Sequence, residues 1–229
     1  MSQIIITVNN KSPNNEAFLI FNQLPSDSSI PHQIFTNTWG KADEVNSGGG
    51  QATFQITENF YAICGSAPSS LAKGLVISVA NHKTADLTTG SKKGSNWKID
   101  IPPNSHGLLF GKDTSDSDAP GGFTINTVGD TWVSSDYPTH YCGLGRDDPT
   151  GNGGGVVPVA VFAPDANQTY KITPERKFWI SYGGDIAGLQ TEIKDFGTPV
   201  LVDFTNKTET QATVDLEANY SWSDVKFSP

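Results

Sequence analysis

The sequence predicts an all-β protein, built as an antiparallel β-sandwich with very little helix. Apolar and polar side chains alternate over short segments, and turn-forming Gly and Pro residues separate these segments. Helical periodicity is almost absent, and only Ser69–Leu75 could form a helical turn. Many short strands joined by regular turns are typical of sandwiches and barrels. A chain of 229 residues can bury a core without disulfides or metals.

The clearest alternation runs from Ala212 to Trp222. Its apolar residues fall on one face of an extended strand and its polar residues on the other, which the 3.6-residue period of a helix cannot achieve. Trp97–Ile101 alternates in the same way. The other segments that predict strands are Ile4–Val8, Phe18–Phe21, Gln33–Thr36, Ala52–Ile56, Phe60–Cys64, Leu75–Val79, Gly107–Phe110, Phe123–Asn126, Val156–Phe162, Tyr170–Ile172, Phe178–Tyr182 and Val200–Phe204.

One segment pattern occurs twice. Phe54–Gly65 and Tyr170–Gly183 both contain aromatic-X-Ile-Thr, a short turn, an aromatic pair and a glycine. Such repetition indicates duplicated units, although hairpins can also converge on one pattern. We therefore predict a single all-β unit over residues 1–229. This unit could be built from two similar halves, at about 15–105 and 155–227, packed face to face or side by side.

The stretch 111–155, which joins these halves, is the least regular part of the chain. It is rich in Gly, Asp, Ser and Pro. Loops on a rigid scaffold often carry binding residues, but a loop of this length would be unusual. We therefore expect strands within it, at Phe123–Asn126 and Thr139–Cys142.

The same stretch contains the residues that we predict to bind a ligand. Aromatic faces stack on sugars or flat ligands, and charged side chains bind polar groups. Of the three tryptophans near strand ends, Trp39, Trp132 and Trp222, the second is the best candidate for exposure, and the third ends an inward-facing row. Arg146 beside two carboxylates could grip a polar ligand, with a salt-bridged turn as the alternative. The predicted ligand-binding residues are Asp130, Trp132, Tyr137, His140, Arg146 and Asp147.

No motif predicts a metal, a cofactor or a catalytic centre. Asp113, Asp116 and Asp118 resemble a calcium loop in composition, but they fail the EF-hand spacing, and a solvated acidic turn is the alternative. His140 and Cys142 could share a strand face as a nucleophilic dyad, or Cys142 could be structural. The histidines show no metal-ligand spacing. We predict no metal and no cofactor.

The two cysteines, Cys64 and Cys142, are expected to be reduced and buried in a cytosolic protein, and could form one disulfide in a secreted one. Met1–Asn10 contains one short apolar run and no basic start, which indicates a strand and not a signal peptide. We therefore expect cytoplasmic localisation. No apolar segment approaches the length of a transmembrane helix.

The net charge of −9 argues against two classes of partner. Nucleic-acid binding depends on Lys and Arg that neutralise phosphates, and anionic membranes attract the same residues. Only Lys92 and Lys93 form an adjacent basic pair. The expected partner is a small molecule or a glycan, and the chain could also form a homo-oligomer.

Several segments together resemble a group of uncharacterised soluble all-β proteins from filamentous fungi. The likeness covers most of the chain and implies a fungal origin. Because no activity is assigned to that group, it implies no catalytic residue. The segments that carry it are Gln33–Asn37, Phe60–Gly65, His140–Gly145 with Asp148-Pro149, Val156–Phe162 and Val202–Thr205.

Three functions agree with these features. The leading hypothesis is a binding protein, lectin-like, that recognises a carbohydrate or another small polar ligand. The first alternative is a small-molecule enzyme of fungal secondary metabolism with a pocket inside the β-scaffold. The second alternative is a structural or storage protein. The absence of a catalytic motif makes an enzyme the less favoured hypothesis.

Overall fold

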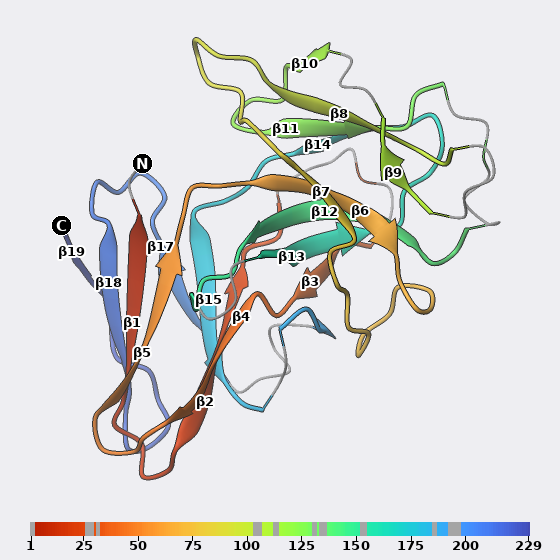
Figure 1. The fold of residues 1–229 in the computed structure, drawn as a ribbon. Helices are drawn as coiled ribbons and strands as arrows, with labels where there is room; N and C mark the ends of the chain where they lie inside the picture. The colour runs from red at the N-terminus through yellow and green to blue at the C-terminus, as the bar shows by residue number, and fades with distance from the viewer. Residues whose placement is uncertain are drawn as a thin grey trace.

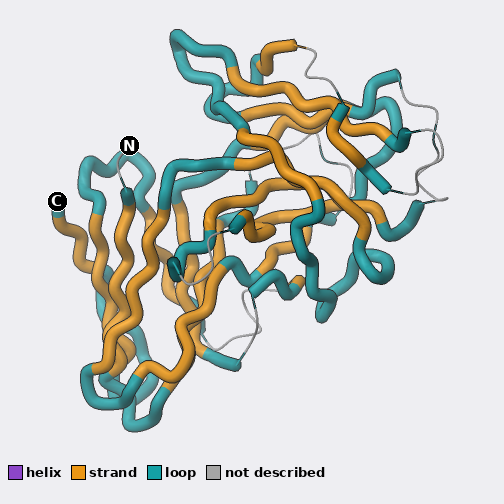
Figure 2. The backbone as a smooth tube through the Cα atoms, in the orientation of Figure 1, coloured by secondary structure: helices purple, strands orange, loops and turns teal. Residues whose placement is uncertain are grey.

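The computed structural model describes residues 3–25, 30, 33–102, 107–111, 115–129, 132, 137–151, 155–184, 187–191 and 198–229. Over these residues the chain consists of strands, bridges, turns and loops without any helix, so the all-β prediction is confirmed (Figure 2). The predicted helical turn at Ser69–Leu75 is wrong, because that segment forms bends and a turn. Nowhere in these ranges is there a helix that could cross a membrane.

Two four-stranded sheets, A and B, form the part of the molecule that contains both termini (Figure 1). Phe204 beyond the last strand of sheet B contacts Phe227 of sheet A at a centroid distance of 5.1 Å, so the sheets face each other across a shared core. Sheet A has the order β19 (Lys226–Ser228), β18 (Gln211–Leu216), β1 (Ile4–Asn10) and β5 (Gly50–Ile56). Sheet B has the order β17 (Val200–Asp203), β15 (Lys177–Tyr182), β2 (Glu16–Asn22) and β4 (Gly40–Val45).

Sheets C and D form the other part. Phe162 of sheet C lies edge-on to Tyr170 of sheet D, at a centroid distance of 4.8 Å. Sheet C has the order β16 (Gln190–Thr191), β3 (Phe35–Asn37), β13 (Val156–Phe162), β12 (His140–Asp147), β6 (Tyr61–Ser66) and β7 (Asn81–Thr84). Sheet D has the order β10 (Ser115–Ser117), β8 (Gly94–Asp100), β11 (Phe123–Asn126) and β14 (Thr169–Ile172), and β9 (Leu109–Phe110) also pairs with β8.

The interior strand β12 is buried on both faces. Cys142 and Leu144 belong to the main core, which joins residues from all four sheets. Tyr141, on the opposite face, packs in a second cluster with Ile63 and Val161. A strand covered on both faces has a continuous buried pattern in place of alternation, which is why the segment His140–Asp147 shows no clear apolar–polar alternation in the sequence.

The strand arrangement recurs along the chain. If the short strands β3, β9, β10, β16 and β19 are left out, β1, β2, β4, β5, β6, β7 and β8 visit sheets A, B, B, A, C, C and D. From β11, the strands β11, β12, β13, β14, β15, β17 and β18 visit D, C, C, D, B, B and A. The first strand of each series pairs in parallel with the last strand of the other series, β1 with β18 and β11 with β8. Every sheet therefore contains strands from both series, with one block of strands lying next to the other.

One side-chain contact also recurs. Strand β2 holds the same place in the first series that β12 holds in the second. By strand register, Asn22 at the end of β2 corresponds to Arg146 at the end of β12. Arg146 donates to the carbonyl oxygen of Thr57, in the turn between β5 and β6, at 2.6 Å. Asn22 donates to the carbonyl oxygen of Glu175, in the turn between β14 and β15, at 3.0 Å. The recurrence agrees with duplication, but the common origin of the two parts stays a prediction.

Several strand bounds differ from those predicted. Strand β18 ends at Leu216, so the alternation from Ala212 to Trp222 does not form one strand. Leu75–Val79 contains only an isolated bridge at Val76. Within the stretch 111–155, Phe123–Asn126 is a strand as predicted, and the strand expected at Thr139–Cys142 extends to Asp147.

Candidate functional site

A tight hairpin turn after β18 builds one side of the candidate site. The Glu217 N–H donates to the Ser221 carbonyl oxygen at 2.8 Å, and the Tyr220 N–H donates to the Glu217 carbonyl oxygen at 2.9 Å. The Asn219 Oδ1 accepts hydrogen bonds from the Ser221 N–H at 3.1 Å and from its hydroxyl at 2.7 Å. The Asn219 side chain therefore stabilises the turn by bonding to the residue two positions later, which is a usual role of Asn in turns. Trp222 then returns to bridge Leu216.

This turn and the start of β17 enclose a groove of about 490 Å³. The size lies within the range of small-molecule sites. None of the lining residues within the described part of the chain carries a charged side chain at neutral pH. Those lining residues are Thr198, Pro199, Val200, Leu201, Asn219, Tyr220, Ser221, Trp222 and Ser223. The groove therefore combines aromatic, aliphatic and neutral polar surface.

Aromatic contacts hold the two groove rings. The Trp222 ring lies 6.1 Å from the rings of both Phe18 and Tyr182, measured between centroids, and its Nε1 donates to the Thr198 carbonyl oxygen at 2.6 Å. The Tyr220 ring lies 5.7 Å from the Tyr182 ring. Both groove rings are half-buried, so each is anchored on one side and reachable by solvent on the other.

Sheets C and D contain a position that corresponds to the groove rings of sheets A and B, and different side chains occupy it. Tyr182 pairs with Phe18 across β15 and β2, and Cys64 pairs with Cys142 at the corresponding position of β6 and β12. There, the Cys64 thiol contacts the Leu108 carbonyl oxygen at 3.6 Å, and all three residues are fully buried. The same strand arrangement therefore forms with small buried side chains at this position. The fold itself does not require a half-exposed aromatic group at this place.

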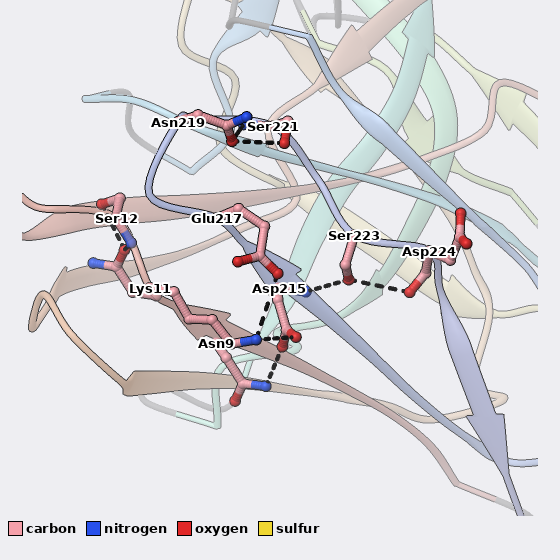
Figure 3. Close-up of polar contacts among 10 residues, drawn as sticks. Asn9, Lys11, Ser12, Asp215, Glu217, Asn219, Ser221, Ser223 and Asp224 are labelled. Atoms are coloured by element: carbon pink, nitrogen blue, oxygen red, sulfur yellow. Dashed lines mark hydrogen bonds and ion pairs between the residues drawn. The ribbon is translucent and has the colours of Figure 1, made fainter.

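A polar network braces the base of the hairpin (Figure 3). Asp215 accepts hydrogen bonds from Asn9 Nδ2 at 2.5 Å and from Lys11 Nζ at 2.6 Å. Its backbone N–H donates to Ser223 Oγ at 3.0 Å. Partial burial acts to raise the pKa of Asp215, but the bonds from Lys11 and Asn9 lower it below its ordinary value. The network ties the groove residue Ser223 to sheet A.

The structure separates the predicted ligand-binding residues into two groups. Tyr137 lies edge-on to both Trp132 and His140, at centroid distances of 6.3 and 4.9 Å. His140 is buried, and its Nδ1 lies 3.2 Å from the Tyr137 carbonyl oxygen. Asp130 lies outside the described residues. This group is at the start of β12, whereas the remaining two predicted residues are at its end.

Arg146 is fully enclosed at that end. It donates to Asn22 Oδ1 at 2.7 Å and to the Thr57 carbonyl oxygen at 2.6 Å. Burial lowers its pKa to about 9, so the guanidinium stays charged at neutral pH. The guanidinium also lies over the rings of Trp39, Phe60 and Phe178, at 4.8, 4.7 and 5.7 Å from their centroids. These contacts indicate a structural cation, because the guanidinium is buried among protein groups.

Asp147 points the opposite way and organises the turn between β5 and β6. It accepts hydrogen bonds from Thr57 Oγ1, Asn59 Nδ2 and Tyr61 Oη, at 2.7, 2.8 and 2.9 Å. Partial burial acts to raise its pKa, but these bonds and the charge of Arg146 together lower it below the ordinary value. Both residues at the end of β12 therefore hold the same turn in place. This role resembles the salt-bridged turn that the sequence analysis gave as the alternative to ligand binding.

We expect Asp147→Asn to lower the free energy of unfolding at pH 7 by about 1 to 2 kcal/mol, because three donors lose a charged acceptor at a partly exposed site. The depressed pKa makes this contribution fully present above about pH 4, the unfolded value, and lost as pH falls through the folded value. Urea denaturation from pH 7 to pH 3 should show the variant and the wild type converging. A difference that stays constant over this range would contradict the assigned role.

The remaining sequence candidates lie in ordinary structural surroundings. Asp118 is exposed and forms an ion pair with Lys93, while Asp113 lies outside the described residues. Among the residues that the structure does describe, no group of acidic, His or Cys side chains could hold a metal. Both cysteines are free and buried. Burial raises the pKa of Cys142 well above its ordinary value, which disfavours the thiolate that a nucleophile requires.

The groove residues were only partly visible in the sequence. Trp222 was noted near a strand end but placed in the core row, and it is in fact half-buried at the groove. The signal that could have found the turn is Asn219-Tyr220-Ser221, since Asn and Ser favour turns. The continued alternation of apolar residues masked it.

The comparisons with known proteins identify a family. No curated protein and no solved structure matches this chain. The sequence model of the RhiA family matches residues 2–225, which is nearly the whole chain. The protein therefore belongs to the RhiA family.

Proposed function

We propose that this protein is a lectin-like binding protein whose groove at the β18 hairpin holds a carbohydrate or another small polar ligand. The observation that carries the proposal is the pair of half-exposed rings, Tyr220 and Trp222, beside neutral polar side chains in one groove. Aromatic faces with a few polar groups are the usual means of binding sugars and flat polar molecules. The other sandwich shows that the strand arrangement forms without such rings.

Backbone strain at the groove supports the same location. Tyr220 has a φ of 63°, in the left-handed region that bulky residues seldom occupy. Such a conformation costs on the order of 1 kcal/mol or more and is frequent at functional sites. Gly or Asn would make the same turn with less strain. The strained backbone at Tyr220 therefore supports a binding role for its ring, in addition to its packing against Tyr182.

Binding explains the groove better than catalysis does. The described groups with strongly displaced pKa values are Cys64, raised to about 12 by burial, together with Cys142, Tyr170 and Arg146. All four are buried in packed surroundings and none lines the groove. Active sites usually place such groups where they can reach the substrate.

The test is a titration with a panel of neutral mono- and disaccharides, followed by tryptophan fluorescence and calorimetry. We expect Tyr220→Asn to weaken binding about tenfold or more, because the ring is lost while Asn tolerates the left-handed backbone. The matched control is Tyr137→Asn, in the aromatic group at the start of β12. Loss of binding in the control alone would place the site there, and no binding by the wild type would refute the proposal.

Origin and location belong to the same proposal. We expect a protein of a filamentous fungus, and the two free buried cysteines support residence in a reducing compartment such as the cytosol. We also expect no nucleic-acid or membrane partner, because the net charge is −9. Cell fractionation and size-exclusion chromatography would test the location and the suggested self-association.

A further inference from the structure

The groove offers an aliphatic wall in addition to its aromatic rings. Pro199, Val200 and Leu201 line the side formed by β17, and Tyr220 and Trp222 line the side formed by the hairpin. A sugar ring needs only an aromatic face for its C–H groups. A second apolar surface is useful to a ligand that also carries a methyl or similar apolar group, because its burial is favourable.

Several polar groups of the described groove lining can donate a hydrogen bond to a ligand. The Asn219 Oδ1 is occupied by Ser221, whereas its amide nitrogen makes no hydrogen bond to another described residue. The Thr198 hydroxyl is equally unpaired among the residues described. The Tyr220 hydroxyl accepts a bond from Asn14 at 2.6 Å, which leaves its own proton for donation. A ligand with an acceptor oxygen would satisfy these groups.

Charge further restricts the ligand. Among the described residues that line the groove there is no Lys or Arg that could pair with an anion, and Asp224 follows directly after the lining residue Ser223. The whole chain carries a net charge of −9, which also repels anions. The lining residues that the structure describes also include no carboxylate that could pair with a cation. The groove therefore favours a neutral ligand.

We propose that the ligand is a neutral N-acetylated saccharide, an inference that rests on the proposed binding function. An acetamido group joins a methyl group to a strong carbonyl acceptor. The methyl would pack on the wall of Pro199 and Leu201, and the carbonyl oxygen would accept from Asn219 or Thr198. The sugar ring would stack on Trp222. One substituent thus accounts for the aliphatic wall, the donors and the absence of charge.

Isothermal titration of the full chain with N,N′-diacetylchitobiose and with cellobiose tests this ligand class. The two disaccharides share a linkage and neutrality, but only the first has acetamido groups. We expect the acetylated disaccharide to bind about tenfold or more tightly than cellobiose. Equal or tighter binding of cellobiose would overturn the inference and leave the binding function standing. Failure of every neutral saccharide to bind would overturn both.

A conservative variant identifies the acetamido contact. Asn219→Asp keeps the Oδ1 acceptor that closes the turn but replaces the donating amide nitrogen with an oxygen. We expect it to remove the preference for the acetylated sugar, about tenfold, with little change in melting temperature. Asn206→Asp is the matched control, since Asn206 is exposed, also has a positive φ and lies outside the groove. An unchanged preference in Asn219→Asp would contradict the proposed contact.

Discussion

Gly143→Ala should lower the free energy of unfolding by about 3 kcal/mol or more, or prevent folding altogether. A Cβ at this position would lie 2.0 Å from the carbonyl oxygen of Ala160 and 3.0 Å from the Cα of Val161. Both are backbone atoms of β13, so no side-chain rotation can relieve the overlap. Strand β12 is also buried on both faces, so it cannot move away without disturbing both clusters.

Urea denaturation followed by circular dichroism measures this effect, with Gly90→Ala as the control. A Cβ at Gly90 would meet nothing within 4 Å, and its φ lies outside the left-handed region. That variant should stay within about 0.5 kcal/mol of the wild type. If Gly143→Ala behaved like its control, the close pairing of β12 with β13 would be wrong.

Arg146→Ala should be the second most damaging change, with a loss of about 3 to 5 kcal/mol. Truncation would leave a cavity against the rings of Trp39 and Phe60, and would leave Asn22 Oδ1 and the Thr57 carbonyl oxygen without their donor. Buried acceptors that lose a partner pay the full cost of desolvation.

Arg146→Met separates the packing contribution from the polar one. Methionine fills much of the volume and can lie against aromatic rings, so we expect it to lose only about 1 to 2 kcal/mol. Urea denaturation should therefore rank the wild type above Arg146→Met and Arg146→Ala last. Saccharide binding by Arg146→Met should equal that of the wild type, because Arg146 lies outside the groove. If Arg146→Met folded normally but bound no saccharide, Arg146 would have to be part of the binding site.

The accuracy of the strand predictions depended on burial. Phe123–Asn126 and Val156–Phe162 were predicted with the bounds that the structure shows, because their side chains pack in the core and are mostly apolar. The strands that the sequence did not predict, β4, β7, β10, β16 and β19, all lie at the edges of their sheets. Edge strands pair on one side and carry polar residues, as Asn81–Thr84 does, so hydrophobic alternation is weak there.

The predicted ligand-binding set failed to come together for a geometric reason. A strand rises about 3.3 Å per residue, which separates His140 from Arg146 by about 20 Å along β12. Nearness in the sequence therefore did not mean nearness in space. The groove instead joins 198–201 with 219–223, which are separated in sequence by strand β18 and meet because sheets A and B face each other.

The sequence by itself determined the all-β class, most of the interior strands and the very low helix content, because these follow from the side-to-side alternation of each segment. Only the tertiary structure decided which strands pair, which rings remain half-exposed and which polar groups lack a partner. Pairing between distant segments, such as β1 with β18, depends on how the whole core closes, and no local pattern encodes it. The groove at Tyr220 and Trp222 is a product of that closure.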